Sequence, residues 1–237
     1  RMRIDALGVL SIKNTGSTAN FVSETGTSLV VGNGTSGHAM TIYSGTGSNG
    51  SIYFADGNSG NATYRGGIQY LHGSDSMRFN TAANNAVMTL DASGNVGIGV
   101  VPEPTWSSNN TALQIGDAGV LFASTNDSFV GLAANAYFDD TNSRYEYINT
   151  DFATLYQQVD GTHLWSTAAS GSADAAISFS ESMRINSSGR LLIGTVEVDV
   201  GFTDSGSGVA IWEDGLFQAA RSSAYAVGMF NKLDNDG

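Results

Sequence analysis

Hydrophobic and polar residues alternate in one short stretch of the chain, residues 87–99, on both sides of a tight turn. Alternation with a period of two is typical of a strand with one buried face. At the turn, Asp91 can accept hydrogen bonds from backbone N–H groups and Gly94 can take a positive φ. The stretch therefore predicts a β-hairpin in which four apolar side chains face inward. These four are Met88, Leu90, Val96 and Ile98.

The same pattern occurs three times, and its methionine stands at positions 2, 88 and 183. Residues 1–13 and 182–194 are the other two copies. A repeat of about ninety residues is a whole small module rather than one turn of a solenoid. We therefore expect residues 1–13 to end a preceding module. We expect 14–99 and 100–194 to be two β modules that each end in the hairpin, and 195–237 to begin a third. Because the first copy opens the chain, we interpret the sequence as part of a longer protein.

Two glycines in the second arm of the hairpin lie on the face opposite Val96 and Ile98. Gly97 and Gly99 bring no side chain to that face, and glycines at such positions indicate that another backbone packs closely. A lone hairpin of this size is marginal in water. We therefore expect a neighbour to cover it, either from the same chain or from another copy.

Between the copies, short apolar runs separated by Gly, Asn, Ser and Asp predict further strands, and no capped helix with a 3.6-residue stripe is visible. Asp160-Gly161 between two such runs is the strongest short hairpin signal in the chain. The expected strands are 29–32, 40–43, 51–55, 67–72, 77–79, 113–116, 119–122, 154–159, 162–167, 209–212 and 216–218. The fold class expected is all-β.

The repeated motif resembles that of a known protein family. Met-x-Ile/Leu-Asp-x-Ser-Gly-Asn-Val-Gly-Ile-Gly is similar to the repeats of bacteriophage tail fibres, particularly those of marine and cyanobacterial phages. Residues 51–57, 64–70 and 160–165 are similar to the blocks that precede the motif in such fibres. Residues 230–237 resemble the segment that leads toward a C-terminal self-cleaving trimerisation chaperone. The first copy departs from the pattern with Lys13 in place of Gly.

The resemblance implies an elongated homotrimeric fibre, a structural part of a phage virion that mediates attachment to the host cell. Its partners would be two further copies of the chain, other phage tail proteins, and a host glycan or receptor reached through a tip outside this sequence. The location would be the virion, outside cells when it acts. Two alternatives stay open: a tailspike enzyme that depolymerises capsule polysaccharide, and a fibre attached to the capsid.

Charge and composition narrow the remaining classes of function. A net charge of −12 with only 10 Lys and Arg argues against binding to nucleic acid or to an anionic membrane surface. No apolar run approaches the ~18 residues of a membrane span. The absence of Cys excludes disulfides and thiolate chemistry. Aromatic residues make up 10% of the chain, which argues against disorder despite the 30 glycines.

No residue rises above background as a catalytic, cofactor-binding or metal-ligating candidate, so we expect no enzyme activity, no cofactor and no metal site. Paired carboxylates occur at Asp139/Asp140 and Glu213/Asp214, and a depolymerising enzyme would need two carboxylates across its sugar. Adjacent acids on a strand point to opposite faces, so turn and surface roles are favoured. His38, His72 and His163 lie far apart without metal-ligand spacing. The three tryptophans are expected in cores rather than under sugars.

Overall fold

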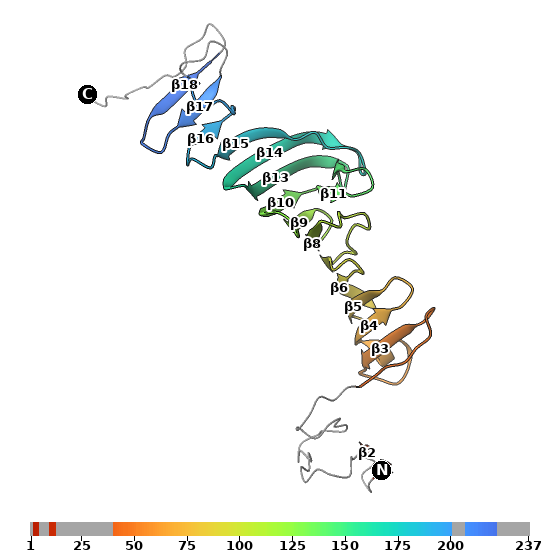
Figure 1. Ribbon diagram of the computed structural model, residues 1–237. Helices are drawn as coiled ribbons and strands as arrows, with labels where there is room; N and C mark the ends of the chain where they lie inside the picture. Colours follow the sequence, from red (N-terminus) through yellow and green to blue (C-terminus); the bar gives the residue numbers. More distant parts are fainter. Residues whose placement is uncertain (1, 5–9, 13–39, 201–206, 222–237) are drawn as a thin grey trace, which may run out of the picture. The chain divides into compact units, whose positions relative to one another are not determined.

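The structure is a computed structural model that describes residues 2–4, 10–12, 40–200 and 207–221. The chain divides into two compact units, residues 1–45 and residues 46–237. In unit 1, strands β1 (Met2–Ile4) and β2 (Leu10–Ile12) form an antiparallel hairpin. In unit 2, the described residues form a 14-stranded sheet and the small hairpin β11–β12 (Figure 1). The prediction of an all-β chain is confirmed for the described residues.

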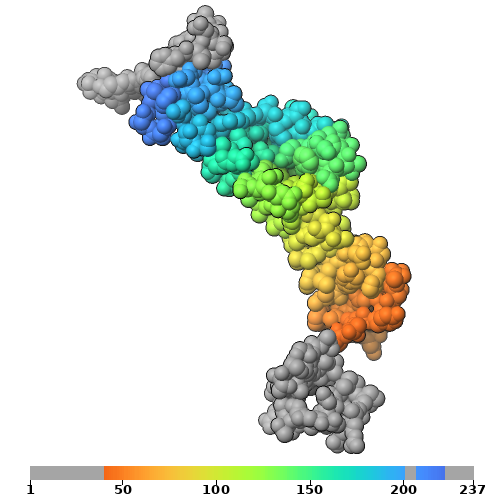
Figure 2. All heavy atoms as spheres, in the orientation of Figure 1, coloured from red at the N-terminus to blue at the C-terminus, as the bar shows by residue number. Residues whose placement is uncertain are grey.

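The sheet of unit 2 keeps its strands in the order of the sequence from β3 to β18, except that β11 and β12 lie outside it. Every neighbouring pair is antiparallel except β7 and β8, which run parallel. In the space-filling view the colours of unit 2 accordingly succeed one another as in the sequence (Figure 2). The helical element among the described residues is the 3-10 turn η1 (Gly60–Tyr64). The strands are β3 (Asn49–Phe54), β4 (Gly66–Leu71), β5 (Ser76–Thr81), β6 (Asn85–Leu90), β7 (Val96–Ile98), β8 (Asn110–Ile115), β9 (Gly119–Ser124), β10 (Phe129–Ala134), β11 (Tyr137–Asp139), β12 (Arg144–Glu146), β13 (Asp151–Val159), β14 (Thr162–Gly171), β15 (Ser180–Ile185), β16 (Leu191–Ile193), β17 (Gly208–Ile211) and β18 (Phe217–Ala220).

Most of the expected strands form, with ends that differ by a few residues. The predicted hairpin around Asp160-Gly161 is confirmed, with Val159 opposite Thr162. The strand expected at 40–43 is wrong, because those residues belong to no strand, and a strand needs a partner for its backbone groups. The strand expected at 29–32 lies outside the described residues. Strands β10, β11 and β12 were not anticipated.

The three copies of the motif adopt one hairpin register, as predicted. Methionine lies opposite isoleucine in each copy: Met2 faces Ile12, Met88 faces Ile98, and Met183 faces Ile193. The turns of the second and third copies also share their backbone bonds, since the N–H of Gly94 donates to Asp91 O and that of Gly189 donates to Asn186 O. Both turn glycines have a positive φ, +88° and +84°.

The Asp91 carboxylate holds its turn through three hydrogen bonds. Oδ1 accepts from the backbone N–H of Ser93 at 2.9 Å and of Asn95 at 2.8 Å, and Oδ2 accepts from Asn95 Nδ2 at 2.9 Å. The buried Asn95 amide in turn accepts from the backbone N–H of Ala112 on β8, at 2.9 Å. Asp91 therefore orients the side chain that connects the hairpin with β8.

Replacing Asp91 with Ala is expected to lower the free energy of unfolding by about 1–3 kcal/mol, because partly buried donors lose their acceptor. Urea unfolding at fixed protein concentration measures the loss. The matched control is Asn186→Asp in the third copy, where Oδ1 of Asn186 accepts from Ser188 and Arg190 N–H groups, each at 3.0 Å. An aspartate can accept both bonds, so this variant should unfold like the parent. Equal behaviour of the two variants would contradict the assigned role.

The glycine face of the second hairpin is covered by the chain that follows it. A Cβ on Gly97 would collide with the carbonyl oxygen of Val100 and approach Pro102 Cδ to 2.9 Å. This confirms that another backbone packs closely there, and the backbone comes from the same chain. Gly99 has open space around it and a φ of +72°, so its role is to turn the chain back over the sheet.

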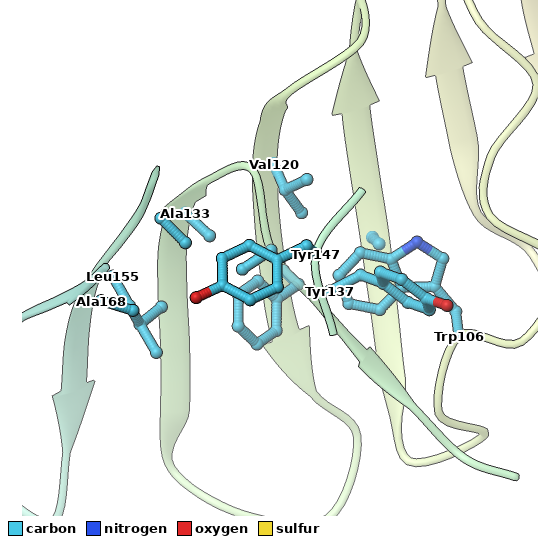
Figure 3. Close-up of a cluster of buried hydrophobic side chains, with 11 residues drawn as sticks. Trp106, Val120, Ala133, Tyr137, Tyr147, Leu155 and Ala168 are labelled. Atoms are coloured by element: carbon cyan, nitrogen blue, oxygen red, sulfur yellow. The ribbon is translucent and has the colours of Figure 1, made fainter. Parts of the chain in front are cut away.

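The main core lies between the sheet and the chain segments that cross it, including β11 and β12 (Figure 3). Phe122, 1% exposed, packs against Trp106 with ring centroids 5.4 Å apart, and Trp106 lies 5.8 Å from Tyr137. Burial raises the pKa of Tyr137 and of Tyr145 to about 12. A smaller cluster joins Leu192, Val200 and Ala210. Unit 2 therefore has a core of its own on one face of its sheet.

Candidate interaction face

The other face of the unit 2 sheet, called the open face below, carries a row of apolar side chains that neither core cluster covers. Residues paired across neighbouring strands point to the same face, so the register defines this row. It crosses the sheet from β4 to β18 without a charged residue. Its members are Tyr70, Met77, Leu90, Val96, Leu113, Leu121, Leu132, Tyr156, Trp165, Met183, Ile193, Val209 and Ala219.

Large apolar side chains of the open face are exposed in the single chain. Leu132 is 56% exposed, Leu121 45% and Ile193 42%. A second row beside the first runs from Ile52 through Ile98 to Ile115, and Ile115 is 54% exposed. Soluble monomers rarely expose contiguous apolar patches beyond a few hundred Å², and larger ones mark interaction sites.

This arrangement corrects one expectation from the sequence. Within the single chain Met88, Leu90 and Val96 are only half-buried and Ile98 is 39% exposed, so the chain's own core does not take up the four side chains that were expected to face inward. The buried side of the hairpin carries Thr89 and Gly97 instead. The alternation was read correctly, but the side that the chain itself covers is the side with the smaller residues, because only there can Val100 and Pro102 approach the sheet.

The open face contains no Asp, Glu, Lys or Arg at any of the strand positions that the register assigns to it. Along the three rows that pass through Ile98, Leu132 and Gln158, the polar side chains are Thr, Ser, Gln, Tyr and His. Among the described residues of unit 2, the charged side chains therefore belong to the turns, the loops and the opposite face. Two copies of this face can approach each other without bringing like charges together.

The candidate carboxylates serve as local hydrogen-bonding groups. Asp139 accepts from the backbone N–H of Asn142 at 2.7 Å, and Asp140 accepts from the hydroxyls of Ser107 and Ser108 at 3.2 and 3.1 Å. Glu213 pairs with Arg190 at 3.2 Å, and Asp214 accepts from the backbone N–H of Leu216 at 3.1 Å. Each acid has a partner close in space that stabilises a turn or crossing.

One carboxyl group that the sequence did not single out is electrostatically unusual. Partial burial raises the pKa of Glu103 above its ordinary value, and the nearby charge of Asp174 adds to the rise. The two residues are far apart in the sequence, so no spacing rule could have paired them.

The histidines and tryptophans are dispersed. His38 lies outside the described residues, and His72 packs edge-on against Tyr70 with centroids 5.0 Å apart. His163 lies on the open face, where its Nδ1 is 2.6 Å from the Tyr156 hydroxyl. Among the described residues, no group of three His, Asp or Glu side chains is placed to hold a metal ion. Trp106 is in the core as expected, while Trp165 is half-buried on the open face.

A shallow hollow lies at the margin of the open face, between the β9–β10 and β13–β14 turns. Its lining includes Asp127, Phe129, Val130, Gln158 and His163. The Glu103–Asp174 pair is not part of this lining. The pairs Asp139/Asp140 and Glu213/Asp214 are also absent from the lining. The hollow therefore contains none of the paired carboxylates.

Comparison with known proteins finds no relative of this chain: no family model, no curated protein and no solved structure matches it. In the part of the chain that the structure describes, no helix has the length and apolar character needed to cross a membrane.

Proposed function

We propose that this chain is a structural fibre protein of a phage virion, in which three copies bury their open faces against one another. The observation that carries the proposal is the uncharged apolar row that crosses the sheet from Tyr70 to Ala219. A face of this kind is costly to leave in water, since burial of apolar surface is worth about 25 cal/mol per Å². The resemblance of the repeated hairpin to tail-fibre repeats favours three-fold closure.

The function of such an assembly is mechanical. Each chain contributes a sheet whose inner face is shared and whose outer face is closed by its own core, which includes Phe122 and Trp106. Acidic side chains remain outside, where they keep the surface soluble. The rod would carry a receptor-binding tip to the host surface and attach through other tail proteins at its far end. Its place would be the virion.

Light scattering of the purified chain tests the assembly. The expected mass is about three times the 24.6 kDa of one chain, with no concentration dependence in the micromolar range. A particle of one-chain mass that retains its β-sheet circular dichroism would overturn the proposal. Imaging of an intact particle labelled on this chain would then assign the fibre to the tail or to the capsid.

A depolymerising tailspike is the second candidate, and the raised pKa of Glu103 beside Asp174 is the observation that favours it. We expect no hydrolysis, because these carboxyl groups do not line the hollow and a sugar must lie between the two acids. The assay is release of reducing ends from bacterial capsule or lipopolysaccharide. Release that is lost in Glu103→Gln or Asp174→Asn, or in Asp139→Asn or Asp140→Asn, would establish the enzyme instead.

A further inference from the structure

The repeats create an alignment problem for any assembly through the open face. The hairpins at Met88 and Met183 present the same residue types in the same register on this face. A neighbouring copy shifted by one repeat would still place apolar residues against apolar residues. Apolar rows alone specify alignment weakly, so a feature that is not repeated must distinguish the correct alignment from the shifted one.

Such a feature lies on β13 and β14, where polar side chains enter the open face. Gln158 lies opposite His163 in the register, and in the same row the pair is flanked by Val130 on β10 and by Ile185 on β15. On the other side of the apolar row, Thr154 lies opposite Thr167. The polar layer is defined here as Tyr156, Gln158 and His163.

The polar layer is held in a fixed geometry within each chain. The Tyr156 hydroxyl is 2.6 Å from His163 Nδ1, and the His163 ring is stacked at 20° to the ring of Trp165, with centroids 6.3 Å apart. Within the described residues, the side-chain amide of Gln158 and Nε2 of His163 make no hydrogen bond. The layer therefore presents an amide and an imidazole that remain available to a neighbour on an uncharged face.

Burial of these groups without partners is unfavourable, because each loses its hydrogen bonds to water. In an alignment shifted by one repeat, Gln158 and His163 of one chain would lie against the equivalent positions of the next, Tyr70 and Met77, neither of which carries an amide or an imidazole. With all chains aligned, each layer meets the same layer of its neighbours, and amide and imidazole groups can pair. A single buried polar residue fixes the alignment of coiled coils by the same logic.

We propose that the polar layer aligns the copies, so that each chain packs against the same residues of its neighbours. This inference rests on the proposed self-assembly and adds the residues that determine its alignment. Gln158 and His163 act as specificity residues of the interface. They are expected to contribute little to the strength of association, which the apolar rows supply.

The absence of cysteine in the sequence allows a direct test. Two versions of the 237-residue chain are co-expressed, one with Ile98→Cys and one, tagged, with Ile193→Cys. These isoleucines occupy equivalent positions of two repeats and both are exposed, at 39% and 42%. Alignment of the copies predicts disulfides that join equal positions, while a shift by one repeat predicts disulfides between position 98 and position 193.

In the otherwise unchanged chain, we expect only disulfides between equal positions. Adding Gln158→Leu and His163→Leu to both versions should leave the particle mass unchanged and yield disulfides between positions 98 and 193. The matched control is Gln157→Leu, the same change one residue earlier, where the side chain belongs to the opposite face. It should give equal-position disulfides only.

The outcomes separate this inference from the proposed assembly. A multimer that keeps equal-position disulfides after loss of the polar layer, or that mixes positions before it, overturns the role of the layer and leaves the assembly standing. A chain that light scattering finds monomeric overturns both.

Discussion

A single aspartate at position 98 is expected to abolish self-association of the chain. Ile98 lies on the open face between Met88 and Ile115 in the register, and it is 39% exposed. In a three-fold assembly Ile98→Asp would bring three carboxylates into one apolar layer, and desolvation costs several kcal/mol for each. Since 1.4 kcal/mol corresponds to a factor of ten, association should weaken by more than about a hundredfold. Light scattering should then give the mass of one chain.

Two controls define this result. Ser93→Asp adds the same charge to the exposed turn of the same hairpin and should leave the multimer intact. Ile98→Val keeps an apolar side chain and should also assemble. The monomer formed by Ile98→Asp should retain the fluorescence of a buried Trp106, because its core does not involve the open face. A multimer of unchanged mass in Ile98→Asp would refute the assignment of the open face.

The hairpins and their turns could be predicted because they depend on local sequence. Asp91 and Gly94 fix a turn through bonds within a few residues, and the alternation around them fixes which side chains share a face. The same holds for Asp160-Gly161. In these places local turn chemistry and the pattern of apolar residues indicate the same structure, and the structure agrees.

The covered side of the sheet could not be predicted from alternation alone. Alternation separates two faces but does not say which of them the rest of the chain will cover. In the hairpin around Asp91, the deciding contact is the approach of Val100 to Gly97, which depends on where the chain turns after Gly99. The strand expected at 40–43 failed for a related reason, since an apolar run forms a strand only when another strand pairs with it.

The open face could be identified only from the register of the strands, which the sequence alone does not give. Its central row joins residues from Tyr70 to Ala219 that come from separate strands, and one residue of slippage in any pair would move the row to the other side. The Glu103–Asp174 pair likewise depends on tertiary proximity. What the sequence did show was the repeated Met–Ile hairpin, and this motif supplied the expectation of association.

A methyl group at Gly131 is expected to destabilise the single chain by overpacking its core. Gly131 lies opposite Phe122 on the core face, and a Cβ there would stand 2.5 Å from the Cε1 and Cζ atoms of the Phe122 ring. The ring cannot retreat easily, because Trp106 and Phe129 lie 5.4 and 5.3 Å away, centroid to centroid. Overpacking of this kind costs about 1–3 kcal/mol. Gly131→Ala should therefore lower the free energy of unfolding by that amount, measured by urea denaturation at fixed protein concentration.

A second substitution identifies the cause of the loss. Phe122→Leu removes the part of the ring that meets the new methyl group, although alone it is expected to destabilise the core by leaving a cavity. In the double variant the methyl group introduced by Gly131→Ala fills part of that space. The double variant should thus lose less than the two single variants added together, by about 1 kcal/mol or more, as neighbouring residues commonly show in such cycles. Strict additivity of the two losses would mean that the Gly131 effect arises from the backbone and not from the Phe122 ring.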